Sequence, residues 1–313
     1  MNKKKISIYT PCFNEEQNIE ICYTAIKNLF EQKLKNYTYE HIFGDNSSND
    51  NSLKILKDIA SKDKNIKILS YSRNFGAFQS LYKGVVTSTG DAIICISADL
   101  QDPPELIPEM VEKWENGFDV VYGKKISREE SFIFQNIRKF YYKLVKQFSF
   151  IDIPENVSEF CLIDKKVQKS LKQFDDYYPY LRGMIANCGF KQAFIEYKWK
   201  KRKFGKTTGT SYILIDNAIN GLISFSNLPM RICLFVGILI SLISIVFSIY
   251  SFFVALILTK KAIPGISMII TAIFFFFGVV LFFLGVVGEY ISAIHSQVRK
   301  KPNVIVNEKI NFD

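Results

Sequence analysis

The first part of the chain alternates between short apolar runs and amphipathic stretches. Apolar runs rich in β-branched and aromatic residues predict strands at 5–13, 39–46, 65–72, 91–97 and 119–123. Apolar residues at helical spacing predict helices between them, at 18–30, 52–60, 79–86 and 105–116. Strands that alternate with helices indicate an α/β fold with a mostly parallel, Rossmann-like sheet and helices on both faces.

Polar residues follow each of the first four predicted strands. Asn14 and Glu15 come after the first, Asp45 ends the second, Arg73 follows the third and Asp99 the fourth. In open α/β sheets the ligand lies outside the carboxyl ends of the strands. The pattern therefore predicts a ligand site along this edge.

The sequence SADLQDPPE at 97–105 follows a buried strand and ends in a rigid Pro-Pro turn. Asp99 and Gln101 supply two oxygen ligands, which suit Mg²⁺ or Mn²⁺ completed by water and substrate phosphates. A metal on a diphosphate neutralises the charge of a departing nucleotide. We therefore predict that this stretch forms the edge of the site that binds a metal and a diphosphate.

The last third of the chain carries two long uncharged stretches, Ile232–Leu258 and Ile266–Val287. Their lengths predict two transmembrane helices, buried core helices being the alternative. Tyr212–Leu228 is amphipathic and predicts a helix on the membrane surface. Arg128–Phe150 is basic and aromatic, which suits a second interfacial helix or an ordinary core helix with a solvated face. We expect no signal peptide at the N-terminus.

Two spans place the N-terminal domain and the tail on one side of the membrane. Arg231 precedes the first span and Arg299–Lys301 follow the second, whereas Lys260 and Lys261 lie in the loop between them. The loop lysines conflict mildly with the positive-inside rule. More basic residues flank the spans on the side of the two termini than lie in the loop. This excess predicts that the N-terminal domain is cytoplasmic and that the protein is a multi-pass protein of the plasma membrane.

The charge, the cysteines and the glycines of the chain indicate its binding partners and its compartment. The net charge is +10, and basic clusters such as Lys198–Lys206 lie near the apolar segments. We interpret them as contacts to membrane lipids rather than to nucleic acid, a solvated basic face being the alternative. None of the six cysteines forms a CxxC pair, which indicates a reducing compartment. Gly278, Gly285 and Gly288 suit a homo-oligomer or ordinary membrane-helix composition.

Several motifs are spread along the chain. They are PCFNEE (11–16), DNSSND (45–50), SRNFG (72–76), SADLQDPPE (97–105), VSEFCLIDKKV (157–167), YLRGMIANCGF (180–190), KFGKTT (203–208) and GEYISAIHSQVRKKP (288–302). Together they resemble the family 2 glycosyltransferases with a GT-A fold. More narrowly, they resemble the polyprenyl-phosphate glycosyltransferases, which include dolichyl-phosphate mannose synthase and bacterial undecaprenyl-phosphate glucosyltransferases. The resemblance covers nearly the whole chain.

The resemblance implies four regions. They are a cytoplasmic GT-A catalytic domain at 1–208, an interfacial helix at 209–230, two transmembrane helices at 231–288 and a cytoplasmic tail at 289–313. It also implies a metal-dependent hexosyltransferase that moves a sugar from a nucleotide-sugar, with a UDP-sugar favoured, to a polyprenyl phosphate such as undecaprenyl phosphate. The product is a lipid-linked monosaccharide for cell-surface glycans.

Residue roles follow from the same resemblance. The residues implied to bind the base, ribose and diphosphate of the donor are Pro11, Phe13, Asn14, Glu15, Asp45, Arg73, Asp99, Gln101 and Arg182. Asp99 and Gln101 are implied to bind the metal. The catalytic set is Asp99, Asp102 and Glu159. The residues implied to bind the acceptor phosphate are Lys125, Arg138, Arg202 and Lys206.

The chain departs from the family pattern at four places. Ser97 stands where an acid is frequent, and Asn46 replaces a frequent Asp as a mild change. Where the family often has Asp-Phe-Arg-Leu, this chain has Glu-Phe-Cys-Leu at 159–162. The family's G-x-S-K pattern is Gly-Lys-Thr-Thr at 205–208, so the lysine lies two places earlier. These departures bear on sugar specificity more than on the reaction class.

The implied reaction is one in-line displacement with inversion at the anomeric carbon. A phosphate acceptor is already ionised at pH 7, so Glu159 is either a base or a group that orients the acceptor. Three alternatives stay open. They are a processive polysaccharide synthase, an enzyme that glycosylates diacylglycerol, and an inactive membrane anchor that binds a nucleotide-sugar, the last favoured by Ser97.

Overall fold

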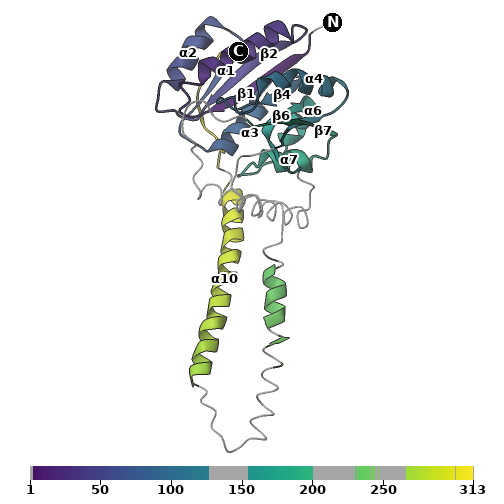
Figure 1. Ribbon diagram of the computed structural model, residues 1–313. Coiled ribbons are helices and arrows are strands. Elements are labelled where there is room, and N and C mark those ends of the chain that lie inside the picture. The colour runs from purple at the N-terminus through teal and green to yellow at the C-terminus, as the bar shows by residue number, and fades with distance from the viewer. Residues whose placement is uncertain are drawn as a thin grey trace, which may run out of the picture.

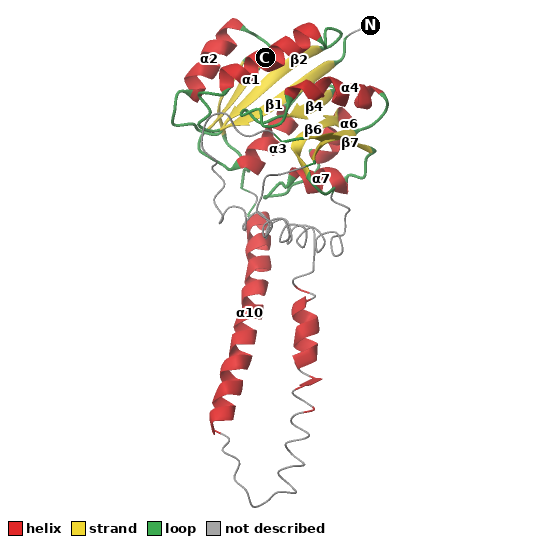
Figure 2. Ribbon diagram, in the orientation of Figure 1, coloured by secondary structure: helices red, strands yellow, loops and turns green. Residues whose placement is uncertain are grey.

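The computed structural model describes residues 3–126, 154–199, 230, 232–240, 242, 243, 246, 266–299 and 301–312. Every strand and helix predicted within 5–123 is present (Figure 2). The predicted helices at 128–150 and 212–228 lie outside the described residues. In chain order the elements are β1 (Lys5–Cys12), α1 (Ile19–Gln32), β2 (Thr38–Asp45), α2 (Ser52–Lys62), β3 (Ile66–Tyr71), α3 (Ala77–Thr87), β4 (Ala92–Cys95), η1 (Pro104–Leu106), α4 (Ile107–Glu115), β5 (Val120–Lys125), β6 (Val157–Asp164), α6 (Lys165–Leu171), α7 (Leu181–Asn187), β7 (Gln192–Tyr197), α10 (Ile266–Val298) and β8 (Val306–Ile310).

One eight-stranded sheet forms the centre of the domain, in the order β7-β5-β6-β4-β1-β2-β3-β8 (Figure 1). β1, β2, β3 and β4 pair in parallel, and β5 pairs in parallel with β7. β6 runs antiparallel to β4 and β5, and β8 runs antiparallel to β3. Six strands therefore share one direction, which confirms the mostly parallel sheet and brings their carboxyl ends to one edge.

Helices cover both faces of this sheet. One apolar layer contains Ile26 of α1, Leu56 of α2 and Met110 of α4. The other contains Leu81 of α3 and Met184 of α7. All five are buried, and burying each such side chain contributes about 1.5–3 kcal/mol. The two layers hold the strands, and with them the loops at the carboxyl edge, in fixed positions.

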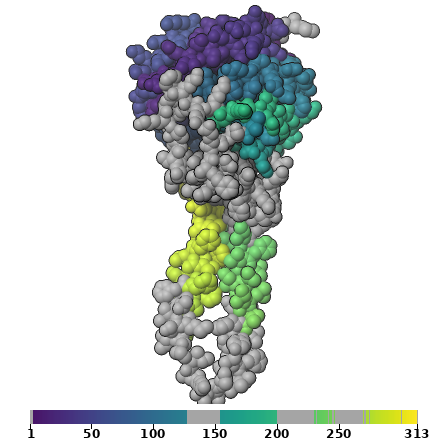
Figure 3. Space-filling view, in the orientation of Figure 1, coloured from purple at the N-terminus to yellow at the C-terminus, as the bar shows by residue number. Residues whose placement is uncertain are grey.

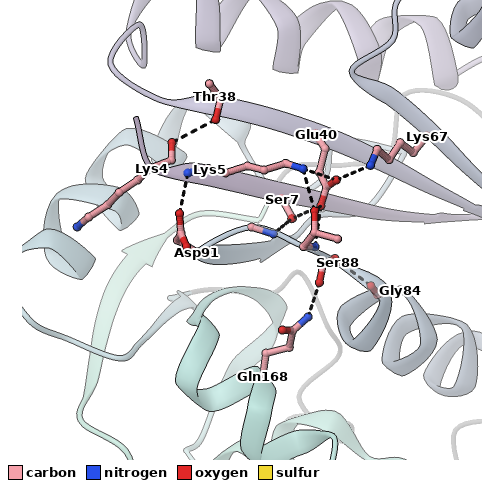
Figure 4. A network of polar contacts seen from close by, with 12 residues as sticks. Lys4, Lys5, Ser7, Thr38, Glu40, Lys67, Gly84, Ser88, Asp91 and Gln168 are labelled. Carbon is pink, nitrogen blue, oxygen red and sulfur yellow. Dashed lines mark hydrogen bonds and ion pairs between the residues drawn. The ribbon is translucent and has the colours of Figure 1, made fainter. Parts of the chain in front are cut away.

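The opposite edge of the sheet is closed by a buried carboxylate (Figure 4). Glu40 of β2 is 1% exposed and accepts hydrogen bonds from Ser7 Oγ at 2.5 Å and from the Thr89 backbone N–H at 2.8 Å. Lys5 Nζ lies at 2.9 Å and Lys67 Nζ at 3.0 Å. Burial raises the pKa of Glu40, but these hydrogen bonds outweigh it and lower the pKa to about 2. The network fixes the starts of the parallel strands.

A long apolar helix extends away from the domain. Within Phe275–Val298, an 18-residue stretch has a mean hydropathy of 2.0 and no buried residue. This part of α10, which projects from the domain (Figure 3), is long and apolar enough to cross a membrane. Ile232 and Val236 share a groove with Phe275 and Phe282, so the helical residues 232–240 lie beside α10. The helix continues to Val298, past the predicted end of the span at Val287.

The chain returns from α10 directly to the central sheet. The backbone N–H of Tyr177 donates to Gln297 Oε1 at 2.9 Å, and Asn303 Nδ2 donates to the Asp176 carbonyl at 2.9 Å. The N–H of Ser72 donates to the Ile305 carbonyl at 3.1 Å, and β8 then pairs with β3. Residues predicted to form only a tail thus add the last strand to the sheet.

Candidate active site

The shared direction of six strands decides which side chains meet at the carboxyl edge. Asn14 follows β1, Asp45 ends β2 and Arg73 follows β3. Asp99 follows β4 and Lys125 ends β5. β6 runs the opposite way, so its first residues, including Glu159, also lie near this edge. The rim predicted from the sequence is therefore assembled by the fold.

The loops after β1 and β2 are hydrogen-bonded to each other. The N–H of Asn14 donates to Ser48 Oγ at 3.0 Å, and the N–H of Asn49 donates back to Asn14 Oδ1 at 2.8 Å. Asn14 has a φ of +56°, a region that Asn enters more readily than most residues. The N–H of Glu15 donates to Ser52 Oγ at 2.9 Å. Both predicted donor-binding loops are held in one arrangement.

Asp45 is the most deeply buried acid of the rim. It is fully buried, and the N–H of Ser48 approaches both of its carboxylate oxygens, at 3.4 and 3.5 Å. Burial raises the pKa of Asp45 above its usual value, although the hydrogen bonds from Ser48 oppose the shift. An acid held in this way suits hydrogen bonding to hydroxyl groups of a ribose, the role implied by the resemblance.

Asn46 connects the loop after β2 to the loop after β3. Its Nδ2 donates to Asn74 Oδ1 at 3.0 Å and to the Gly76 carbonyl at 3.3 Å, and its Oδ1 accepts from the Phe75 N–H at 2.9 Å. Arg73 is exposed in the same loop, with its guanidinium 4.1 Å from the ring centre of Phe75. Asn46 thus sets the loop that presents Arg73, a role that the sequence analysis missed.

Asp99 and Gln101 are held in a tight turn after β4. The N–H of Gln101 donates to Asp99 Oδ1 at 3.2 Å, and the intervening Leu100 has a φ of +50°. Both side chains are partly exposed. No group of three His, Cys, Asp or Glu side chains suited to a metal occurs among the described residues. The pair fits a Mg²⁺ or Mn²⁺ that takes its other ligands from water and a diphosphate.

Asp102 lies away from the exposed pair and is enclosed by basic and aromatic groups. It is 4% exposed, and Tyr197 donates its hydroxyl proton to Asp102 Oδ1. Lys125 Nζ lies 3.5 Å from the same oxygen and 4.6 Å from the ring centre of Trp199. Asp102, in the loop after β4, is therefore an ion-pair partner of Lys125, which ends β5.

Glu159 and Arg182 reach the rim from the other face of the sheet. Glu159 is partly exposed and alternates with Phe160, so it shares a face with Val157 and Cys161. Arg182 of α7 donates from Nη1 to the Val157 carbonyl at 2.7 Å and from Nε to the Tyr180 hydroxyl at 2.7 Å. Arg182 is thus fixed against the first residue of the strand that carries Glu159.

The structure brings most of the predicted site residues to one edge. Pro11 lies in β1 and Phe13 follows it, both partly exposed. Arg138, Arg202 and Lys206 lie outside the described residues and stay predictions. Tyr197 and Ser158 were not predicted, because their polar contacts depend on strand pairing that no local motif reveals.

Comparisons with known proteins agree with this architecture. A crystal structure of a mycobacterial protein has the same fold at 14% identity, with a TM-score of 0.50 over 71% of this chain and 74% of that one. Mannosyltransferase PcManGT from Pyrobaculum calidifontis, solved with GDP-Man and Mn²⁺, covers 96% of this chain and 87% of its own, at 14% identity and a TM-score of 0.49. The mycobacterial structure supports the fold described above, a mostly parallel sheet with helices on both faces.

Sequence comparison defines the family. Residues 7–171 match Glycosyl transferase family 2. An uncharacterized glycosyltransferase from Synechocystis is 36% identical over 97% of this chain and 95% of its own length. A prophage bactoprenol glucosyl transferase homolog from Escherichia coli is 32% identical, over 96% of this chain and 98% of its own. The chain belongs to glycosyl transferase family 2, as the motifs predicted.

Proposed function

We propose that this protein transfers a sugar from a nucleotide-sugar, with a UDP-sugar favoured, to a polyprenyl phosphate such as undecaprenyl phosphate. One observation carries the proposal. At the rim, two side chains with oxygen ligands, Asp99 and Gln101, are held in one turn after β4, and Lys125 ends β5, with β6 between the two strands. The names of the bactoprenol glucosyl transferases from Escherichia coli and Shigella flexneri support a lipid phosphate acceptor.

The chain's own residues have separate roles in this proposal. Asp99 and Gln101 hold Mg²⁺ or Mn²⁺, which neutralises charge on the leaving diphosphate when bound. Asp45 and the loop of Asn14 hold the nucleoside, and Arg73 lies beside the base. Arg182 faces the diphosphate.

The acceptor is a phosphate oxygen that attacks the anomeric carbon in line with the leaving group, so the configuration inverts. Lys125 orients this anion. Because the phosphate is ionised at pH 7, positioning and charge neutralisation supply most of the rate, and Glu159 orients the acceptor rather than removing a proton.

The strand order supports two membrane crossings. β7 precedes α10 in the chain and β8 follows it, yet both strands belong to one sheet. The chain between them must therefore cross the membrane an even number of times. If α10 is one crossing, a second lies earlier, where the helical residues 232–240 are placed beside it. We propose a transmembrane hairpin in the plasma membrane with a cytoplasmic catalytic domain.

A transfer assay tests the function. Full-length protein in detergent receives undecaprenyl phosphate, Mg²⁺ or Mn²⁺, and radiolabelled UDP-glucose, UDP-GlcNAc or GDP-mannose in turn. We expect lipid-phase label that needs both the lipid phosphate and the metal and disappears with EDTA. We expect Asp99→Asn to lower kcat at least about 100-fold, because charge stabilisation of the leaving group is lost.

Asp58→Asn on the exposed face of α2 is the matched control and should keep full activity. Both variants should unfold at the temperature of the wild type. Full activity of Asp99→Asn in the presence of EDTA would exclude the metal role. Absence of label with every donor would exclude the proposed transfer.

A further inference from the structure

A buried polar cluster lies under the rim, and Lys125 is its only member with a role in the reaction described so far. It consists of Ser158 on β6, Tyr197 on β7, Asp102 after β4 and Lys125 on β5. We propose that Asp102 and Tyr197 form a positioning pair that holds the Lys125 ammonium where a phosphate oxygen of the acceptor binds. The inference rests on the proposed function and concerns how that site is held.

The hydrogen bonds of the cluster run in one direction. Tyr197 donates its only hydroxyl proton to Asp102, so Ser158 Oγ, 3.3 Å from the Tyr197 oxygen, donates to Tyr197. Lys125 Nζ lies 3.5 Å from the Asp102 oxygen that accepts from Tyr197. These contacts lead from Ser158 through Tyr197 and Asp102 to the ammonium group, so each of the three side chains acts on the position of Lys125.

Burial makes this arrangement rigid. The side chain of Lys125 is 10% exposed and that of Asp102 is 6% exposed. A charge so far from water is held close to its partner, because separating the pair would leave both charges buried and unpaired. Asp102 therefore determines the position of the ammonium group along the rim.

The ring of Tyr197 is fixed by a glycine. A Cβ added to Gly123 would lie 2.9 Å from Tyr197 Cε1 and 2.7 Å from Phe160 Cδ1, so only glycine lets both rings approach β5. Phe160 meets the Tyr197 ring edge to face at 5.9 Å. Trp199 lies under the ammonium of Lys125 at 4.6 Å. Two further aromatic rings, those of Phe160 and Trp199, thus pack against the cluster.

This geometry favours positioning over base catalysis for Asp102. A general base must reach the proton that it removes, whereas Asp102 is enclosed and its Oδ1 already accepts from Tyr197 and faces Lys125. An ionised phosphate acceptor also carries no proton that must be removed. Asp102 acts through Lys125, and Lys125 meets the substrate.

Tyr197→Phe tests the inference with little change of shape. Removing a hydrogen bond to a charged group should raise KM for the lipid phosphate about 10-fold. KM for the donor and kcat at saturating acceptor should stay within about twofold of wild type. Tyr23→Phe is the matched control, because Tyr23 makes a similar hydrogen bond to Asp63, 3.1 Å long, away from the rim.

Fluorescence gives a readout without turnover. The chain has two tryptophans, so in a Trp114→Phe background the emission of Trp199 reports on the Lys125 site. Titration with a short-chain polyprenyl phosphate should change this emission, with a Kd raised by Tyr197→Phe and unchanged by Tyr23→Phe. Equal acceptor KM and Kd in both variants, or a rise in donor KM alone, would overturn the inference and leave the proposed function intact. Absence of transfer by wild type would overturn both.

Discussion

Single residues at the rim act mainly by connecting loops. Asn46 is the clearest example, because its amide both donates and accepts. An aspartate, the residue frequent in the family at this position, keeps the acceptor but loses the donor. The substitution in this chain therefore couples two loops that a carboxylate would couple less well. The same property makes Asn46 a sensitive position for donor binding.

Asn46→Asp should raise KM for the nucleotide-sugar about 10-fold with a smaller change in kcat. The new carboxylate oxygen would face two other acceptors, Asn74 Oδ1 and the Gly76 carbonyl, which costs about 1–3 kcal/mol. Steady-state kinetics with varied donor measures this. Asn65→Asp, exposed at the other end of the sheet, is the control. Equal donor KM in both variants would show that the loop connection does not serve binding.

At the scale of elements, local periodicity predicted the strands and helices of the parallel half, because each carries its own apolar signal. β8 could not be predicted in this way, since its sequence VNEKI is largely exposed and forms only by pairing with β3. The rim acids were predictable because they directly follow strands. Tyr197 was not, because its partner Asp102 is 95 residues away in the sequence.

Asn311 fixes β8 to the domain, so Asn311→Ala should destabilise the protein. Asn311 Nδ2 donates to the Ala60 carbonyl at 2.9 Å and the Ile66 carbonyl at 2.8 Å, and its φ of +59° disfavours alanine. We expect a loss of about 1–3 kcal/mol and a fall in Tm of several degrees, measured by thermal unfolding in detergent.

The control for this prediction is a residue of α2 that also contacts β8. Lys57 makes an exposed ion pair with Glu308 of β8, with both side chains 43% exposed. Lys57→Ala should therefore change the free energy of unfolding by less than about 1 kcal/mol. Equal Tm values for the Asn311 and Lys57 variants would show that β8 contributes little to stability.

For the whole molecule, two buried groups predict a loss of stability in acid. Burial lowers the pKa of His41 from 6.5 to about 3. The pKa of Glu40 falls from 4.5 to about 2, where hydrogen bonds overcome burial. As pH falls, the unfolded chain therefore binds a proton at each of these groups before the folded chain does. The stability that each group contributes is therefore full above its unfolded pKa and lost as pH falls through the folded value.

Tm should accordingly fall from pH 6.5 downward, first through His41 and below pH 4.5 through Glu40 as well. His41→Gln can keep the contact that His41 Nε2 makes with Thr10 Oγ1 at 3.0 Å but does not titrate, so its Tm should vary less between pH 6.5 and 4.5. The chain has one other histidine, and His295→Gln on α10 should follow the wild type. Parallel curves for wild type and His41→Gln would contradict the assignment.

In the proposed topology, the position of β8 would also make completion of the sheet depend on membrane insertion. β3 has an open edge until β8 arrives, and β8 is made only after α10. A nascent chain whose apolar segments entered the bilayer with the wrong orientation would leave β8 on the far side. Such a chain keeps an unpaired strand edge, which invites aggregation and proteolysis. In that topology, a complete sheet would thus distinguish correctly inserted chains from misinserted ones during biogenesis.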